Sequence, residues 1–246
     1  MLQPWSRDLR VWQKNAYYEY FTTNKRNFLM VATPGAGKTI AAARIAHHLL
    51  STEAIERVAV VCPSEHLKRQ WHDALASVGI QIDFKWKNAS GAVALDYHGI
   101  AITYQQVASN PDIHRMHCRR RTLVIFDEVH AYDTYMNSLF TRLLIWLRAV
   151  GASVIVLSAT LPAKTRKELV TAWRGTKEGV KVLDDARYPV VTVATQDSLS
   201  SESLPGDEER HITVEWIEPD KEALIKELQP TGQKKTDQDK DGWMGY

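Results

Sequence analysis

Short apolar runs alternate with longer amphipathic stretches along most of the chain. The apolar runs predict buried strands, and they begin at Phe28, Val58, Ile100, Leu123 and Val154. The stretches that follow them have helical spacing and predict helices over residues 39–50, 64–78, 134–150 and 163–174. This alternation is typical of an α/β fold, with a mostly parallel sheet and helices on both faces.

The pattern weakens after Val193. Residues 196–210 are rich in Ser, Glu and Asp and predict a loop, 211–217 alternate like one more strand, and 220–228 fit a short helix. The last residues are almost purely polar, which is typical of disorder. We therefore expect an α/β domain over 1–193, the start of a linker or a partial extension over 194–228, and a disordered tail over 229–246.

Composition and charge say little about partners, but they indicate the size of the core and the cellular compartment. A chain of 246 residues can bury one good core. Its 31 basic and 29 acidic residues give a net charge of +2, which indicates no particular partner. Two cysteines, Cys62 and Cys118, favour a reducing compartment over a disulfide framework. Because we find no signal-peptide core and no bilayer-length apolar run, we expect a cytoplasmic location.

A glycine-containing loop lies between the first predicted strand and the first predicted helix. It consists of Thr33, Pro34, Gly35, Ala36, Gly37, Lys38 and Thr39. Its glycines allow several backbone N–H groups to point at one anion beside a helix N-terminus. Lys38 would then reach the β- and γ-phosphates of ATP, and Thr39 would bind Mg²⁺. Ala32 stands where the strict motif has its first glycine, which costs little if φ is negative. The alternative, a turn that only caps a helix, does not explain Lys38 and Thr39.

Paired carboxylates follow the strand that begins at Leu123. In phosphate-loop enzymes an acid at the tip of a neighbouring strand holds Mg²⁺, and Asp127 fits that role. Glu128 would polarise the attacking water as a general base. An acid pair that merely begins a helix is the alternative.

Two hydroxyls, those of Ser158 and Thr160, follow the strand that begins at Val154. With the two preceding motifs in this order, the chain resembles the DExH-type superfamily 2 helicases and translocases. The resemblance implies a RecA-like ATP-binding domain. It also implies that Gln13 reads adenine and that Ser158 and Thr160 relay the nucleotide state. His130 would connect the nucleotide site to these hydroxyls.

The resemblance extends to strand ends that contact the nucleic-acid backbone in that superfamily. The implied contacts are Pro63, Ser64, Lys68, Arg69, Thr103 and Tyr104. The expected partner is single-stranded nucleic acid, with DNA favoured over RNA. Arg115, Arg119, Arg120 and Arg121 form a separate basic cluster that fits either a phosphate contact or a solvated loop.

The second half of the chain resembles the helicase part of the CRISPR-associated helicase-nuclease. The residues that carry this likeness are 127–136, 157–162 and 187–189. The first half is more similar to general bacterial DEAD/DEAH-box helicases related to restriction-enzyme motor subunits. A second helicase domain or a CRISPR effector complex is therefore an expected partner.

The sequence thus predicts the ATP-binding domain of a superfamily 2 helicase or translocase. The superfamily places ATP between two such domains, so we expect a truncated chain that is weak or inactive by itself. Two alternatives stay open: a phosphate-loop ATPase that acts on a protein partner, and an inactive remnant that binds nucleic acid.

The tryptophans at helical positions favour the core over base stacking, and they are Trp71, Trp146 and Trp173.

Overall fold

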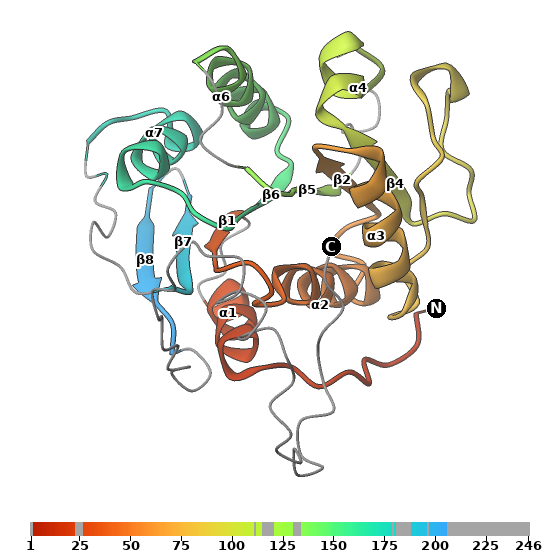
Figure 1. Cartoon of the computed structure of the whole chain (residues 1–246), viewed down its shortest axis with the longest axis horizontal. Coiled ribbons are helices and arrows are strands. Elements are labelled where there is room, and N and C mark those ends of the chain that lie inside the picture. Colours follow the sequence, from red (N-terminus) through yellow and green to blue (C-terminus); the bar gives the residue numbers. More distant parts are fainter. Residues whose placement is uncertain are drawn as a thin grey trace, which may run out of the picture. The chain divides into compact units, whose positions relative to one another are not determined.

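The computed structural model describes residues 2–22, 27–110, 112–114, 121–129, 134–178, 180, 188–195 and 197–205 (Figure 1). The helices in this part of the chain are α1 (Val11–Thr22), α2 (Lys38–Ser51), α3 (Glu65–Ala76), the 3-10 turn η1 (Asn88–Ser90), α4 (Tyr104–Ser109), α6 (Thr134–Ala149) and α7 (Ala163–Arg174). The strands are β1 (Asn27–Val31), β2 (Arg57–Cys62), β3 (Ile82–Asp83), β4 (Gly99–Thr103), β5 (Thr122–Phe126), β6 (Ser153–Ser158), β7 (Val190–Ala194) and β8 (Leu199–Ser203). The four helices and five strands predicted from the hydrophobic pattern are confirmed.

The eight described strands form one sheet in the order β3-β4-β2-β5-β6-β1-β7-β8. The six strands from β3 to β1 in this order are parallel to their neighbours. β7 is antiparallel to both β1 and β8. The mostly parallel α/β sheet predicted from the sequence is therefore confirmed.

Helices cover both faces of this sheet (Figure 1). α1, α2 and α3 lie on one face, and α4, α6 and α7 lie on the other. Successive residues of β2 point to opposite faces, so that Val58 and Val60 join one core while Ala59 and Val61 join the other. Burial on both faces explains why the strands read as unbroken apolar runs.

The C-terminal end of the sheet differs from the sequence prediction. Leu199–Ser203, inside the expected loop over 196–210, forms β8 and pairs with β7 from Val190↔Ser203 to Ala194↔Leu199. Its polar side chains fit an edge strand, because ladder hydrogen bonds come from the backbone and do not require apolar side chains. The described sheet therefore continues to Ser203. The elements expected over 211–217, 220–228 and 229–246 lie outside the described residues.

Within the described part of the chain, each helix is too short or too polar to cross a bilayer.

The close approach of β2 and β4 depends on a glycine. Gly99 begins β4 opposite Val58, and a Cβ atom at Gly99 would overlap the carbonyl group of Val58. We expect Gly99→Ala to lower the free energy of unfolding by about 3 kcal/mol, at the upper end for overpacking, because backbone atoms must move. Urea denaturation followed by circular dichroism measures this loss.

Gly151→Ala is the matched control, because Gly151 has a φ of +72° but no atom within 4 Å of the added Cβ. We expect it to cost only the conformational strain, about 1 kcal/mol. Equal losses in the two variants would contradict a packing constraint at Gly99.

Candidate nucleotide-binding site

Three strand ends meet at one edge of the sheet. β1, β6 and β5 are parallel neighbours, so their carboxyl ends lie together. The backbone N–H of Ala32 donates to the carbonyl of Ser158 (3.0 Å), and that of Val129 donates to Leu157 (3.0 Å). The three predicted motifs, at residues 32–39, 127–128 and 158–160, are thereby brought to the same edge, where open parallel sheets bind ligands.

The loop between β1 and α2 has the backbone conformation of an anion-binding turn. Gly35 and Gly37 have φ values of +74° and +85°, in the left-handed region that favours glycine. Gly37 caps the N-terminus of α2. Ala32 is not among the residues with positive φ, so alanine fits the first glycine position of the motif. The loop therefore presents N–H groups at a helix N-terminus, as a phosphate group requires.

Lys38 is held at the base of this loop. Its side chain is only 7% exposed, and Nζ donates to the carbonyl oxygens of Ala32 (2.9 Å) and Thr33 (3.5 Å). Nζ also lies 3.9 Å from Oε1 of Glu128. Burial lowers the pKa of the Lys38 ammonium, and the carboxylates of Glu128 and Asp127 oppose that shift. The electrostatic attraction between a poorly hydrated ammonium of this kind and a polyanion such as ATP is strong.

Asp127 is a buried carboxylate, 6% exposed, at the end of β5. Its Oδ2 accepts a hydrogen bond from the indole Nε1 of Trp71 (2.7 Å), and its main-chain carbonyl accepts one from the hydroxyl of Tyr104 (3.1 Å). Burial raises the pKa of the Asp127 carboxyl, and the Trp71 hydrogen bond opposes the rise. The sequence identified Asp127 but gave no sign that Trp71 would hold it.

Glu128 has a φ of +53°, which is unusual for a residue with a side chain. This conformation turns the chain at the end of β5, where Glu128 remains near Lys38. Backbone strain of this kind is concentrated at functional sites. The placement fits the role of general base predicted for Glu128.

The start of α1 is attached to the phosphate loop by three side chains. Arg10 Nη1 donates to the carbonyl of Gly35 (3.2 Å), Trp12 Nε1 to Ala36 (3.0 Å), and Gln13 Nε2 to Gly37 (2.9 Å). Gln13 Oε1 also accepts from the backbone N–H of Arg10 (2.9 Å). The sequence selected Gln13 as an adenine contact but did not reveal that three side chains near the start of α1 bond three consecutive loop carbonyls.

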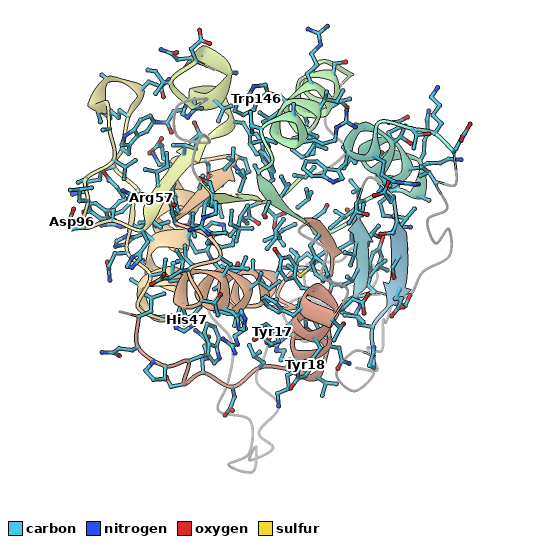
Figure 2. All side chains as sticks on the ribbon, turned by 180° about the vertical axis from the view of Figure 1, so that it is seen from behind. Tyr17, Tyr18, His47, Arg57, Asp96 and Trp146 are labelled. Carbon is cyan, nitrogen blue, oxygen red and sulfur yellow. The ribbon has the colours of Figure 1, made fainter. Side chains whose placement is uncertain are left out.

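The N-terminal segment before α1 is anchored on α2. The guanidinium of Arg44 lies 5.2 Å from the ring centre of Trp5 and 4.4 Å from that of Tyr17. His47 Nε2 makes a hydrogen bond of 2.8 Å with the carbonyl of Gln3. The hydroxyl of Tyr17 in α1 makes a hydrogen bond of 2.7 Å with Nδ1 of His48 in α2, next to His47 (Figure 2). These contacts fix the segment that leads into Arg10 and the loop.

The predicted coupling residues are described only in part. Ser158 is fully buried, and its hydroxyl donates to the carbonyl of Thr160 (3.1 Å), whose side chain is exposed. The Ser158 carbonyl is the acceptor for Ala32, so β6 and the loop are joined directly. His130 lies outside the described residues.

The residues predicted to contact nucleic acid divide into two groups. Pro63, Ser64 and Arg69 are exposed at the start of α3, where the Ser64 hydroxyl caps the helix by accepting from the N–H of Leu67. Thr103 is buried and caps α4 through a capping box with Gln106.

Lys68 and Tyr104 are buried, with 1% and 8% of their surface exposed. Lys68 Nζ contacts Glu65 Oε2 (3.2 Å) and donates to Gln106 Oε1 (3.3 Å). The Tyr104 ring packs in the core beside Phe126. Because long polar side chains can only contact a phosphate if they reach solvent, these two positions favour structural roles.

Of the basic cluster 115–121, Arg121 is described and the other arginines are not. Arg121 precedes β5, at the edge of the sheet opposite to Asp127, and its Nη2 lies 3.6 Å from Glu56 Oε1. This position favours the solvated-loop interpretation for Arg121.

The tryptophans predicted to belong to the core do so. Trp71 and Trp173 are buried, and Trp146 of α6 packs against the core on the face opposite to α1 (Figure 2). Cys62 is also buried, and burial raises the pKa of its thiol to about 12. No cluster of three metal-ligating side chains occurs among the described residues.

The site offers the chemistry that a nucleoside triphosphate requires. It combines backbone N–H donors, a buried ammonium, and two carboxylates of which one is desolvated. The Thr39 hydroxyl and the Asp127 carboxylate are hard oxygen ligands of the type that Mg²⁺ prefers. The residues present therefore fit a nucleotide with its metal ion.

Comparison with known proteins identifies relatives of this arrangement. A family model described as type III restriction enzyme, res subunit, matches residues 6–163. An uncharacterized protein of Mycobacterium leprae is 49% identical over 126 residues, which are 51% of this chain and 21% of that protein. The CRISPR-associated endonuclease/helicase Cas3 of Thermus thermophilus is 42% identical over 107 residues, which are 43% of this chain and 11% of that protein. The chain thus spans about a fifth or less of the length of these relatives.

The fold is also that of a solved helicase domain. The crystal structure of T. fusca Cas3 with AMPPNP matches 86% of this chain and 30% of that one, with a TM-score of 0.66 and 18% identity. This likeness confirms the RecA-like fold predicted from the sequence.

The contact between Gly37 and Gln13 generates a prediction. A Cβ atom at Gly37 would lie 2.5 Å from Gln13 Nε2, whereas one at Gly35 would meet no atom within 4 Å. Both glycines have positive φ, so alanine strains both. We expect Gly37→Ala to weaken binding of a fluorescent ATP analogue about tenfold more than Gly35→Ala, which corresponds to roughly 1.4 kcal/mol.

Fluorescence anisotropy measures both affinities. Gln13→Ala in the Gly37→Ala background removes the clash, so the two substitutions together should weaken binding by less than the sum of their separate effects. Equal affinities of the two glycine variants would show that Gln13 does not restrict the loop.

Proposed function

We propose that this chain, which belongs to the type III restriction enzyme, res subunit, family, is the first motor domain of a nucleic-acid helicase or translocase. It is a superfamily 2 helicase-like ATP-binding domain. The observation that carries the proposal is the approach of Lys38 and Glu128 to 3.9 Å beside Asp127, from two separate strand ends. A purely structural glycine turn would not require these three charges together.

The proposed reaction is hydrolysis of ATP to ADP and phosphate. Residues 33–39 would hold the phosphate groups, with Lys38 on the β- and γ-phosphates. Gln13 would contact the adenine, from its position beside Gly37. Thr39 and Asp127 would hold Mg²⁺, which neutralises charge on the phosphate oxygens. Glu128 would accept a proton from the water that attacks the γ-phosphorus, while the bond to the β-phosphate oxygen breaks.

Motors of this superfamily complete the site with a second domain, which supplies an arginine that accelerates phosphoryl transfer. The described residues form one sheet and contain one such site. We therefore propose that the 246-residue chain, assayed alone, binds ATP but turns it over slowly. Ser158 and Thr160 would transmit the nucleotide state to the rest of a complete motor.

Single-stranded DNA is the proposed track. The exposed start of α3 supports this proposal, because Ser64 follows the carboxyl end of β2, at the same edge of the sheet as the nucleotide site, and Arg69 is exposed in the second turn of α3. Contacts of this kind bind the phosphate backbone and are independent of sequence. The similarity to Cas3 supports a second helicase domain or a CRISPR effector complex as the protein partner, in a reducing compartment such as the cytoplasm.

One observation favours a different partner. Lys68, Thr103 and Tyr104, three of the six residues predicted to contact nucleic acid, are buried. A phosphate-loop ATPase that remodels a protein would not need them at the surface. The two functions differ in whether single-stranded DNA alters nucleotide binding or turnover.

The function is tested first at Lys38. We expect Lys38→Ala to abolish detectable binding of an ATP analogue, because the buried ammonium is the main cation of the site. Lys167→Ala, at an exposed position on α7, should bind like the wild-type chain. Isothermal titration with Mg²⁺ and AMPPNP measures both, and equal affinities would contradict the proposed site.

The nucleic-acid partner is tested by a pair of arginine variants. We expect the wild-type chain to bind a labelled oligo(dT) in a salt-dependent manner, and Arg69→Ala to bind it several-fold more weakly because a backbone contact is lost. Arg121→Ala, at the opposite edge of the sheet, should leave binding unchanged. If the wild-type chain does not bind the oligonucleotide, the protein-remodelling alternative is favoured.

A further inference from the structure

Trp71 holds the Asp127 carboxylate by a hydrogen bond. Neither phosphate binding nor hydrolysis, as proposed above, assigns a role to Trp71. The indole N–H of Trp71 donates to Oδ2 at 2.7 Å, which is at the short end of the range for charge-assisted hydrogen bonds. Trp71 is 1% exposed, and Asp127 is 6% exposed. A bond this well shielded from water constrains the carboxylate far more than a surface contact would.

Trp71 belongs to α3, the helix that begins at the exposed edge described above. Ser64 caps the N-terminus of that helix, and Arg69 lies two residues before Trp71. An indole ring has only two rotatable side-chain bonds, so a small shift of α3 must move the N–H group with it. A ligand that shifts the start of α3 would therefore also change the hydrogen bond between Trp71 and Oδ2 of Asp127.

A second connection runs through α4. Lys68 of α3 donates to Gln106, whose side chain also completes the capping box at Thr103. Tyr104, which follows Thr103, donates a hydrogen bond from its hydroxyl to the Asp127 carbonyl at 3.1 Å. The N-terminal ends of α3 and α4 are thus joined to each other and, by separate hydrogen bonds, to the same aspartate.

We propose that Trp71 is a positioning residue, which orients Asp127 for Mg²⁺ and links occupancy of the α3 edge by single-stranded DNA to the nucleotide site. The inference rests on the proposed function, because it requires both a nucleotide and a strand to bind. Trp71 engages Oδ2 and would restrict the orientation in which the Asp127 carboxylate holds Mg²⁺. Hydrogen-bond partners of this kind typically change metal affinity about ten- to hundredfold.

The test is Trp71→Phe, which keeps an aromatic ring in the core but removes the N–H donor. Affinity for AMPPNP is measured with Mg²⁺ and with EDTA in its place. We expect the affinity with Mg²⁺ to fall about tenfold or more, while the affinity with EDTA stays within about twofold of wild type. A variant that was merely destabilised would lose both affinities together.

The link to the strand is measured in the same titrations with saturating oligo(dT). The ratio of the AMPPNP dissociation constants without and with oligo(dT) reports the coupling between the two sites, which must be reciprocal. We expect this ratio to differ from one by about fivefold or more in the wild-type chain. In Trp71→Phe we expect the ratio of the two dissociation constants to be close to one.

Trp86→Phe is the matched control. Trp86 is also 1% exposed, and its indole N–H also makes a hydrogen bond, to the carbonyl of Gly91 (3.2 Å). It packs in the core on the other face of the sheet from Trp71. The substitution therefore removes the same group from an equally buried site, and we expect wild-type coupling and wild-type Mg²⁺ dependence.

Two results would overturn the inference while leaving the proposed function intact. One is wild-type Mg²⁺ dependence or wild-type coupling in Trp71→Phe. The other is an equal loss in Trp71→Phe and Trp86→Phe. Failure of the wild-type chain to bind oligo(dT) or AMPPNP at all would instead overturn the proposed function, so the two failures are distinguishable.

Discussion

The parallel pairing of β5 with β6 and of β6 with β1 is the constraint on which the candidate site depends. Parallel strands point their carboxyl ends the same way, so the chain segments that leave them emerge side by side. Hydrogen bonds from Ala32 to Ser158 and from Val129 to Leu157 continue this alignment beyond the strands. Lys38 and Glu128, which are far apart in the sequence, consequently approach to 3.9 Å.

Buried charge is the second feature of the site. Lys38 and Asp127 are both largely removed from water, and burial alone would favour their neutral forms. Hydrogen bonds offset this cost: loop carbonyls accept from Lys38, and the Trp71 indole donates to Asp127. The charges are therefore fixed in place before any ligand arrives. Such a preorganised site can stabilise the charge of a phosphate group without first reorganising itself.

The hydrophobic pattern predicted most of the helices and strands, because periodic burial is a local property of each segment. It failed at β8, where pairing with β7 organises a polar segment through backbone hydrogen bonds. The motifs at the strand ends predicted Lys38, Asp127 and Glu128 as site residues. They did not predict how neighbouring side chains such as Trp71 are oriented toward them. Lys68 and Tyr104 look like surface contacts in the sequence, yet both point inward.

The sequence by itself determined the family resemblance, the α/β class and which residues are proposed to bind phosphate and Mg²⁺. Those features depend on short runs, such as the glycines that allow positive φ at 35 and 37. Only the tertiary structure decided that Gln13 bonds Gly37 and that Trp71 bonds Asp127. Contacts between distant segments depend on strand order and on how each helix is rotated against the sheet, and the residue pattern of a single segment does not contain that information.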